Sequence, residues 1–137
     1  MTIKNLTFSI LAMTLICSSV FAEQGVQTYK NQRGSLLELE IIGDNKIQGF
    51  FTTAVASKSC PEAIGKKQPI IGYTVGNALT FSVVYPSCGS VVSITGNFLK
   101  KQSKIDTLSI VNHQSNNVTH EGPDSRFIGH DRYHKVD

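Results

Sequence analysis

The apolar residues of this chain recur at every second position, and this period-two pattern constrains the fold more than any other feature. Leu37, Leu39 and Ile41 alternate with Glu38 and Glu40, and similar segments rich in β-branched residues follow along the chain. Successive side chains of a strand point to opposite faces, so the pattern is typical of strands with one buried face. With 40% hydrophobic and 17% charged residues, the chain has the composition of a compact globule. The sequence therefore predicts an all-β protein.

Short clusters of Gly, Pro, Asn and Asp separate the alternating segments at positions 43–45, 76–77 and 86–89, as expected for tight turns. Seven extended runs result, at residues 37–41, 47–53, 69–75, 78–85, 91–100, 105–111 and 127–136. A further piece at residues 29–31, separated by Arg33 and Gly34, is interpreted as part of the first strand beyond a bulge and brings the count to about eight. Consecutive antiparallel strands protect their edges by closing on themselves. We predict an eight-stranded antiparallel up-and-down β-barrel, a meander.

The apolar parity of each strand identifies the side chains that face the interior. A barrel of about eight strands has room for one small ligand. In an antiparallel meander the start of one strand and the end of the next share a rim, so we expect polar inward residues to surround one mouth: Ser35, Thr53, Tyr85, Ser90, Ser109 and Asp131. For the hydroxyl residues, hydrogen bonds to local backbone are the alternative. A carboxylate on an apolar face is costly without partners, so Asp131 requires hydrogen-bond donors.

The first 22 residues are typical of a secretory signal peptide. Lys4 precedes a nearly continuous apolar run over residues 6–20, and Ala22 ends a short segment suited to cleavage. The run is shorter than the roughly 20 apolar residues of a membrane-spanning helix. We therefore predict a signal peptide at residues 1–22 and one barrel domain at residues 23–137, secreted or periplasmic and not in a membrane.

Cys17 belongs to the predicted signal peptide, which leaves Cys60 and Cys88 in the mature chain. In an oxidising compartment a disulfide between them is the first interpretation, and a metal site or a catalytic thiol is the alternative. We expect no metal site and no cofactor.

The charge balance and the motifs exclude other classes of protein. Thirteen basic against ten acidic residues, with Lys4 in the leader, give too weak a positive charge for a nucleic-acid partner. No serine lies in a hydrolase nucleophile motif, so an enzyme is not expected.

Three segments resemble the avidin and streptavidin family. Residues 29–35 (YKNQRGS) resemble its opening strand, residues 47–55 (IQGFFTTAV) its second strand and residues 128–136 (IGHDRYHKV) its closing strand. Cys60 and Cys88 also fall where some bacterial members of the family carry a disulfide. The resemblance extends over residues 29–136 and implies an eight-stranded barrel that binds biotin without catalysis.

The resemblance implies a role for individual residues at the biotin site. Asn31 and Ser35 match donors to the ureido oxygen, and Asp131 and Thr53 match acceptors of the two ureido N–H groups. Ser90 matches a contact to the valerate carboxylate. A ureido group needs both donors and acceptors, because each unmatched buried group costs roughly 1 to 3 kcal/mol.

The aromatic residues depart from the family's pattern, since the sequence contains no Trp. Phe51 stands where the family has a Tyr that donates to the ureido oxygen, and Val92 replaces a hydroxyl residue. Pro123 approximates a Trp that a neighbouring subunit usually lends. Three further Trp positions hold Tyr85, Ile94 and Ser109. Trp dominates binding where it is present, so a weakened affinity for biotin is expected.

Two other functions and an assembly state complete the hypotheses. A barrel that has lost biotin could serve as a protein or peptide interaction or inhibitor module. An exported enzyme with Asp131 as general base is disfavoured, because no partner base or nucleophile is evident.

The family usually forms dimers or tetramers, and we predict a homo-oligomer, a dimer, on an outward apolar face formed by Val91, Leu99, Leu108 and Ile110.

Overall fold

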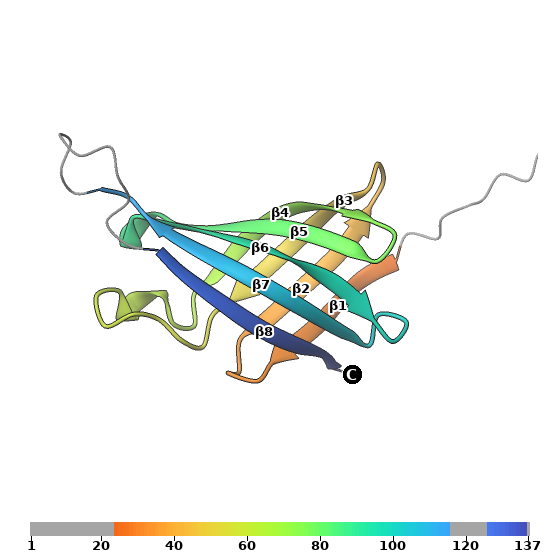
Figure 1. Ribbon diagram of the computed structural model, residues 1–137, viewed down its shortest axis with the longest axis horizontal. Helices are drawn as coiled ribbons and strands as arrows, with labels where there is room; N and C mark the ends of the chain where they lie inside the picture. The colour runs from red at the N-terminus through yellow and green to blue at the C-terminus, as the bar shows by residue number, and fades with distance from the viewer. Residues whose placement is uncertain (1–23, 116–125, 137) are drawn as a thin grey trace, which may run out of the picture.

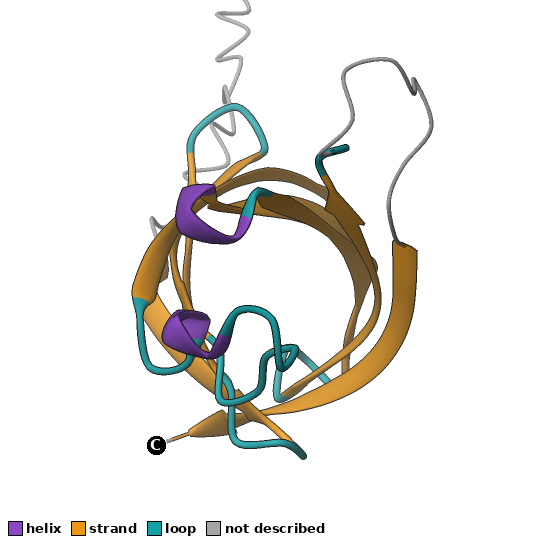
Figure 2. Ribbon diagram, turned by 90° about the vertical axis from the view of Figure 1, so that its left-hand side faces the viewer, coloured by secondary structure: helices purple, strands orange, loops and turns teal. Residues whose placement is uncertain are grey.

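The computed structural model describes residues 24–115 and 126–136, and these residues form a closed barrel (Figure 1). Its eight strands are β1 (Gln24–Asn31), β2 (Leu36–Ile42), β3 (Lys46–Thr52), β4 (Lys67–Val75), β5 (Ala78–Tyr85), β6 (Ser90–Leu99), β7 (Lys104–His113) and β8 (Arg126–Val136). Each strand pairs antiparallel with the next, and β8 pairs antiparallel with β1 to complete the ring seen end-on in Figure 2. The predicted eight-stranded antiparallel meander is confirmed.

Tight turns join the strands at one end of the barrel. Asp44 and Asn45 both have a φ of 60° between β2 and β3, a left-handed conformation that these residue types tolerate. Gly76 and Asn77 form a two-residue turn that pairs Val75 with Ala78. Both turns lie where the sequence predicts them.

The opening strand differs from the prediction, because residues 29–41 form two strands and not one strand with a bulge. The Gly34 N–H donates to the Asn31 carbonyl at 3.0 Å, and Gly34 has a φ of 94°, which favours glycine. Together these features reverse the chain between β1 and β2. A register shift does occur in β1, between Gln24 and Gln27.

Alternation of side chains places the apolar face of every strand inside the barrel. Leu37, Val83 and Ile105 are fully shielded from solvent, and Phe81 is 1% exposed. The half of the barrel near the Gly76 turn is filled by Leu39, Ile47, Leu79, Phe81, Phe98 and Ile105. This packed half forms the floor beneath the opposite end, where the longer connections lie.

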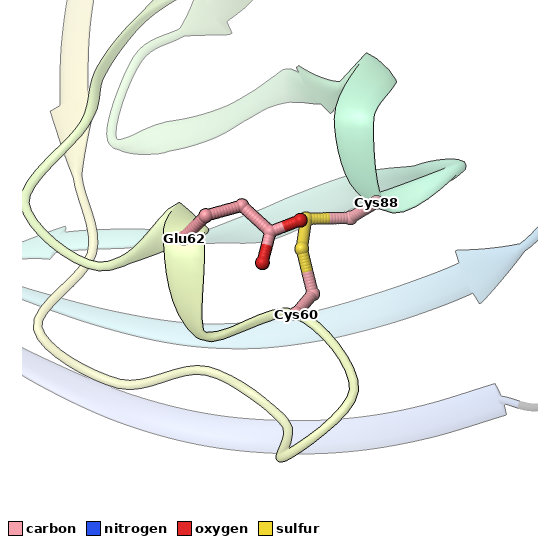
Figure 3. Close-up of side chains that lie close together, drawn as sticks. All are labelled: Cys60, Glu62 and Cys88. Atoms are coloured by element: carbon pink, nitrogen blue, oxygen red, sulfur yellow. A yellow bond between two sulfur atoms is a disulfide. The ribbon is translucent and has the colours of Figure 1, made fainter.

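The opposite end carries two short 3-10 helices, η1 (Pro61–Ala63) after β3 and η2 (Pro86–Cys88) after β5 (Figure 2). A disulfide joins Cys60, the residue before η1, to Cys88, the last residue of η2, with the two Cα atoms 5.6 Å apart and a sequence separation of 28 residues. The predicted pairing is confirmed. Glu62 lies against the bridge (Figure 3), but both sulfurs are bonded to each other, so this group offers no thiolate to a metal.

Some sequence predictions fall on segments outside the described residues: the signal peptide with Cys17, and the loop with Pro123. Within the described part of the chain, no helix has both the length and the apolar character needed to cross a membrane.

Candidate ligand-binding site

A cavity of about 440 Å³ opens at the end of the barrel that carries the disulfide. Pockets for small molecules range over roughly 300 to 1,000 Å³. All nine site residues predicted from the sequence line it: Asn31, Ser35, Phe51, Thr53, Tyr85, Ser90, Ile94, Ser109 and Asp131. The predicted grouping of polar side chains at one mouth above an apolar floor is therefore present in the fold.

Asn31 and Ser35 sit on either side of the β1–β2 turn, and their polar atoms are oriented by the backbone. Asn31 Oδ1 accepts hydrogen bonds from the backbone N–H groups of Arg33 at 3.0 Å and Ser35 at 2.8 Å. Ser35 Oγ accepts from the Ala54 N–H at 3.0 Å. The acceptor atoms are thus engaged by the protein. The Asn31 amide has two protons, one of which serves the hydrogen bond with Tyr133, so one amide proton and the Ser35 hydroxyl proton remain to interact with a ligand.

Thr53 has the opposite polarity toward the cavity. Its Oγ1 donates to the Val55 carbonyl at 2.6 Å and accepts from the Val55 N–H at 3.2 Å. A hydroxyl group has one proton and two lone pairs, so the remaining capacity of Thr53 is that of an acceptor.

Asp131 on β8 is 7% exposed and is fully supplied with donors. Arg33 Nη2 lies 2.6 Å from each carboxylate oxygen, and Arg33 Nε lies 2.9 Å from Oδ1. The Gln32 side-chain amide also donates to Oδ1 at 2.9 Å. The hydrogen-bond donors that an inward carboxylate requires are thus supplied to Asp131 by Arg33 and Gln32 of the β1–β2 turn.

Two tyrosines deep in the site have altered acidity. Burial raises the pKa of Tyr85 to about 12. Burial raises the pKa of Tyr133 as well, and the negative charge of Asp131 adds to this, while a hydrogen bond with Asn31 and the charge of Arg33 oppose it. Both hydroxyl groups therefore stay protonated at neutral pH and act as neutral polar groups.

Sequence reasoning missed several residues of the cavity wall. The pattern around Arg33 indicates only a bulge, whereas the inward carboxylate of Asp131 is the signal that a cation should face it. The loop residues 55–57 and Ala63 reach the cavity because the disulfide holds their connection at the mouth. At the rim, Phe127 is 57% exposed and stacks edge-on against His113, with ring centroids 6.3 Å apart.

The fold and the cavity define a class, the meander barrels whose interior has room for one small molecule. Residues 22–136 match the Avidin family. The chain therefore belongs to the avidin family.

Solved structures show the same barrel. The bradavidin2–biotin complex is 28% identical with a TM-score of 0.67, over 82% of this chain and 98% of that chain. The intact apo form of afifavidin is 25% identical with a TM-score of 0.69, over 83% of this chain and 82% of that chain. The rhizavidin–biotin complex has a TM-score of 0.67 over 83% of this chain and 93% of that chain, and at 19% identity it supports the fold alone. No curated protein matches the sequence.

Proposed function

We propose that this chain is an exported, non-catalytic biotin-binding protein of avidin type whose affinity is weakened by the loss of aromatic residues. The observation that carries the proposal is the polarity of the cavity. Asn31 and Ser35 present donors and Thr53 presents an acceptor around one cavity of suitable size. Asp131 adds a carboxylate to the same wall, which Arg33 and Gln32 supply with donors in the ligand-free protein.

This arrangement is complementary to a cyclic urea. The ureido oxygen would accept from the Asn31 amide and the Ser35 hydroxyl, and one ureido N–H would donate to Thr53 Oγ1. The second N–H would face Asp131. In a site shielded from water, each matched group avoids a penalty of roughly 1 to 3 kcal/mol. The bradavidin2 structure, a complex with biotin, is consistent with this assignment.

The apolar part of the site supports a low affinity. A Trp side chain buries on the order of 150 to 250 Å², equivalent to about 4 to 6 kcal/mol at ~25 cal/mol per Å². Ser109 and Ile94 line the cavity at two positions where the resemblance places Trp, and Ser109 supplies little apolar area. Phe51 fills its position but has no hydroxyl group to donate. We therefore expect biotin to be held mainly by its ureido group.

Calorimetric titration of the mature protein with biotin tests the function. Ser35→Ala should weaken binding roughly tenfold, because it removes a donor to the ureido oxygen. Ser82→Ala, on the exposed outer face of β5, is the matched control and should bind biotin like the wild type. Absence of binding at millimolar biotin would contradict the proposal and favour the interaction or inhibitor module.

The disulfide supports an oxidising location, secreted or periplasmic, because such bridges persist outside the cytosol. The ion pair of Asp131 with Arg33 supports a non-catalytic role, because the carboxylate oxygens that would accept a proton from a substrate already accept hydrogen bonds from the guanidinium group.

The outer face of β6, β7 and β8 supports a homo-oligomer. Leu108 and Ile110 are 53% and 44% exposed, and Ile110 lies directly opposite Ile128, which is 78% exposed. Val91 on β6 is diagonal to Ile110 on β7. Leu99 lies near the other end of β6, past the Asn97–Asp106 pair, and is therefore separated from the other three predicted residues. We propose a dimer built on Val91, Leu108, Ile110 and Ile128.

A further inference from the structure

Arg33 lies inside the cavity mouth and not on the outer surface. Its backbone N–H is held by Asn31 Oδ1 at 3.0 Å, which fixes the turn, and its side chain extends to β8. A Cβ atom at Gly129 would lie 3.5 Å from Arg33 Nη2 and 2.6 Å from Ser109 Oγ. Because Gly129 and Asp131 lie on the same inward face of β8, the guanidinium group covers the inner surface of that strand.

The guanidinium group occupies acceptor sites that a ligand would use. A carboxylate oxygen has two lone pairs. Asp131 Oδ1 already receives three N–H contacts, one from Gln32 and two from Arg33, and Oδ2 receives one from Arg33. A ligand N–H directed at this carboxylate must displace Arg33 or share Oδ2 with it.

Guanidinium and urea have the same planar shape, a central carbon bonded to three heteroatoms with N–H groups at the edge. We propose that Arg33 is a specificity-determining residue, an internal analogue of the ligand's ureido edge that competes with the ligand for Asp131. The inference deepens the proposed function and rests on it to the extent that the ligand is a cyclic urea.

Arg33 and Asp131 differ in how readily each side chain can move out of the ion pair. The Arg33 side chain is 42% exposed, whereas the Asp131 side chain is 9% exposed. Arg33 can therefore turn out into water and regain hydration, while Asp131 stays in place and needs a new donor. A ligand that binds Asp131 replaces the N–H groups of Arg33 with its own. Its affinity is therefore reduced by the free energy of the ion pair that must be broken. Ligands that do not reach Asp131 are unaffected.

Arg33→Met removes the donors and keeps an unbranched apolar side chain. Calorimetry should show that Arg33→Met binds biotin roughly ten- to hundredfold more tightly than the wild type, because charge-assisted hydrogen bonds no longer compete. Arg132→Met is the matched control for net charge, since Arg132 lies on β8 with a side chain 74% exposed and faces Asp106 on the outside. It should bind biotin like the wild type. Melting curves establish that each variant is folded.

A second titration separates this inference from the proposed function. Arg33→Ala leaves a gap beside Asp131, and methylguanidinium should bind there, but not in the Arg33→Ala/Asp131→Asn double variant. If no variant binds biotin while methylguanidinium binds Arg33→Ala, the biotin function is wrong and the subsite for planar N–H donors is supported. If the wild type binds biotin and folded Arg33→Met binds it no more tightly, or if methylguanidinium does not bind Arg33→Ala, competition by Arg33 is refuted.

Discussion

Tyr85→Phe should stabilise the ligand-free protein, although it removes a polar group from the site. Tyr85 is 6% exposed, and among the residues that the structure describes none forms a hydrogen bond with its buried hydroxyl group. A buried polar group without a partner costs roughly 1 to 3 kcal/mol. Deleting the hydroxyl should therefore raise the free energy of unfolding by about 1 to 2 kcal/mol, since the ring still fills the space.

Tyr29→Phe is the matched control, because the same atom is removed from a hydroxyl group that has partners. Tyr29 Oη donates to Gln27 Oε1 at 2.7 Å or to the Gln102 carbonyl at 2.9 Å. Its loss should lower the free energy of unfolding by about 1 to 2 kcal/mol. Urea unfolding of the wild type and both variants measures the two changes. If Tyr85→Phe destabilises the protein as much as Tyr29→Phe does, the hydroxyl of Tyr85 has a partner and the reasoning fails.

The acidity of Tyr85 adds a dependence on pH. Its pKa is about 12 in the folded protein against 10 for an exposed tyrosine. The unfolded chain therefore ionises first, and the free energy of unfolding falls as pH rises from 10 to 12. Urea unfolding over that range should show a smaller fall for Tyr85→Phe than for the wild type. Replacing Cys60 and Cys88 by Ser should lower the free energy of unfolding by about 3 to 4 kcal/mol, as estimated from the entropy of closing the loop, and thiol titration of the native wild type should find neither cysteine reactive. Leu108→Glu with Ile110→Glu should convert the proposed dimer to folded monomers in light scattering, whereas a wild type that is already monomeric would contradict the interface.

Most of the fold follows from local rules that the sequence displays. Alternation fixes which face of each strand is buried, and Gly76 with Asn77 fixes one hairpin within two residues. The prediction was wrong at residues 29–41, where apolar alternation on both sides of Arg33 and Gly34 gives the same pattern for a bulge as for a hairpin. The Asn31 side chain decides between them through hydrogen bonds that periodicity does not represent.

The site could be predicted as a set of positions but not as a set of partners. Strand parity brings Ser35, Thr53 and Asp131 to one mouth, and the structure places them there. The partner of Asp131 could not be derived, because Arg33 is 98 residues away in sequence and lies in a turn, where parity is undefined. The ligand roles of these residues stay predictions until binding is measured.

The pairing of β1 with β8 brings the two ends of the barrel together. Val136 lies opposite Thr28, four residues from the start of β1 at Gln24, so the ends are separated by roughly 13 Å at about 3.3 Å per residue. A short linker can therefore join residue 136 to residue 24, and new termini can be opened at Gly76 and Asn77, far from the cavity mouth. Because the strands form a closed ring, a circularly permuted chain that begins at this turn should fold to the same barrel.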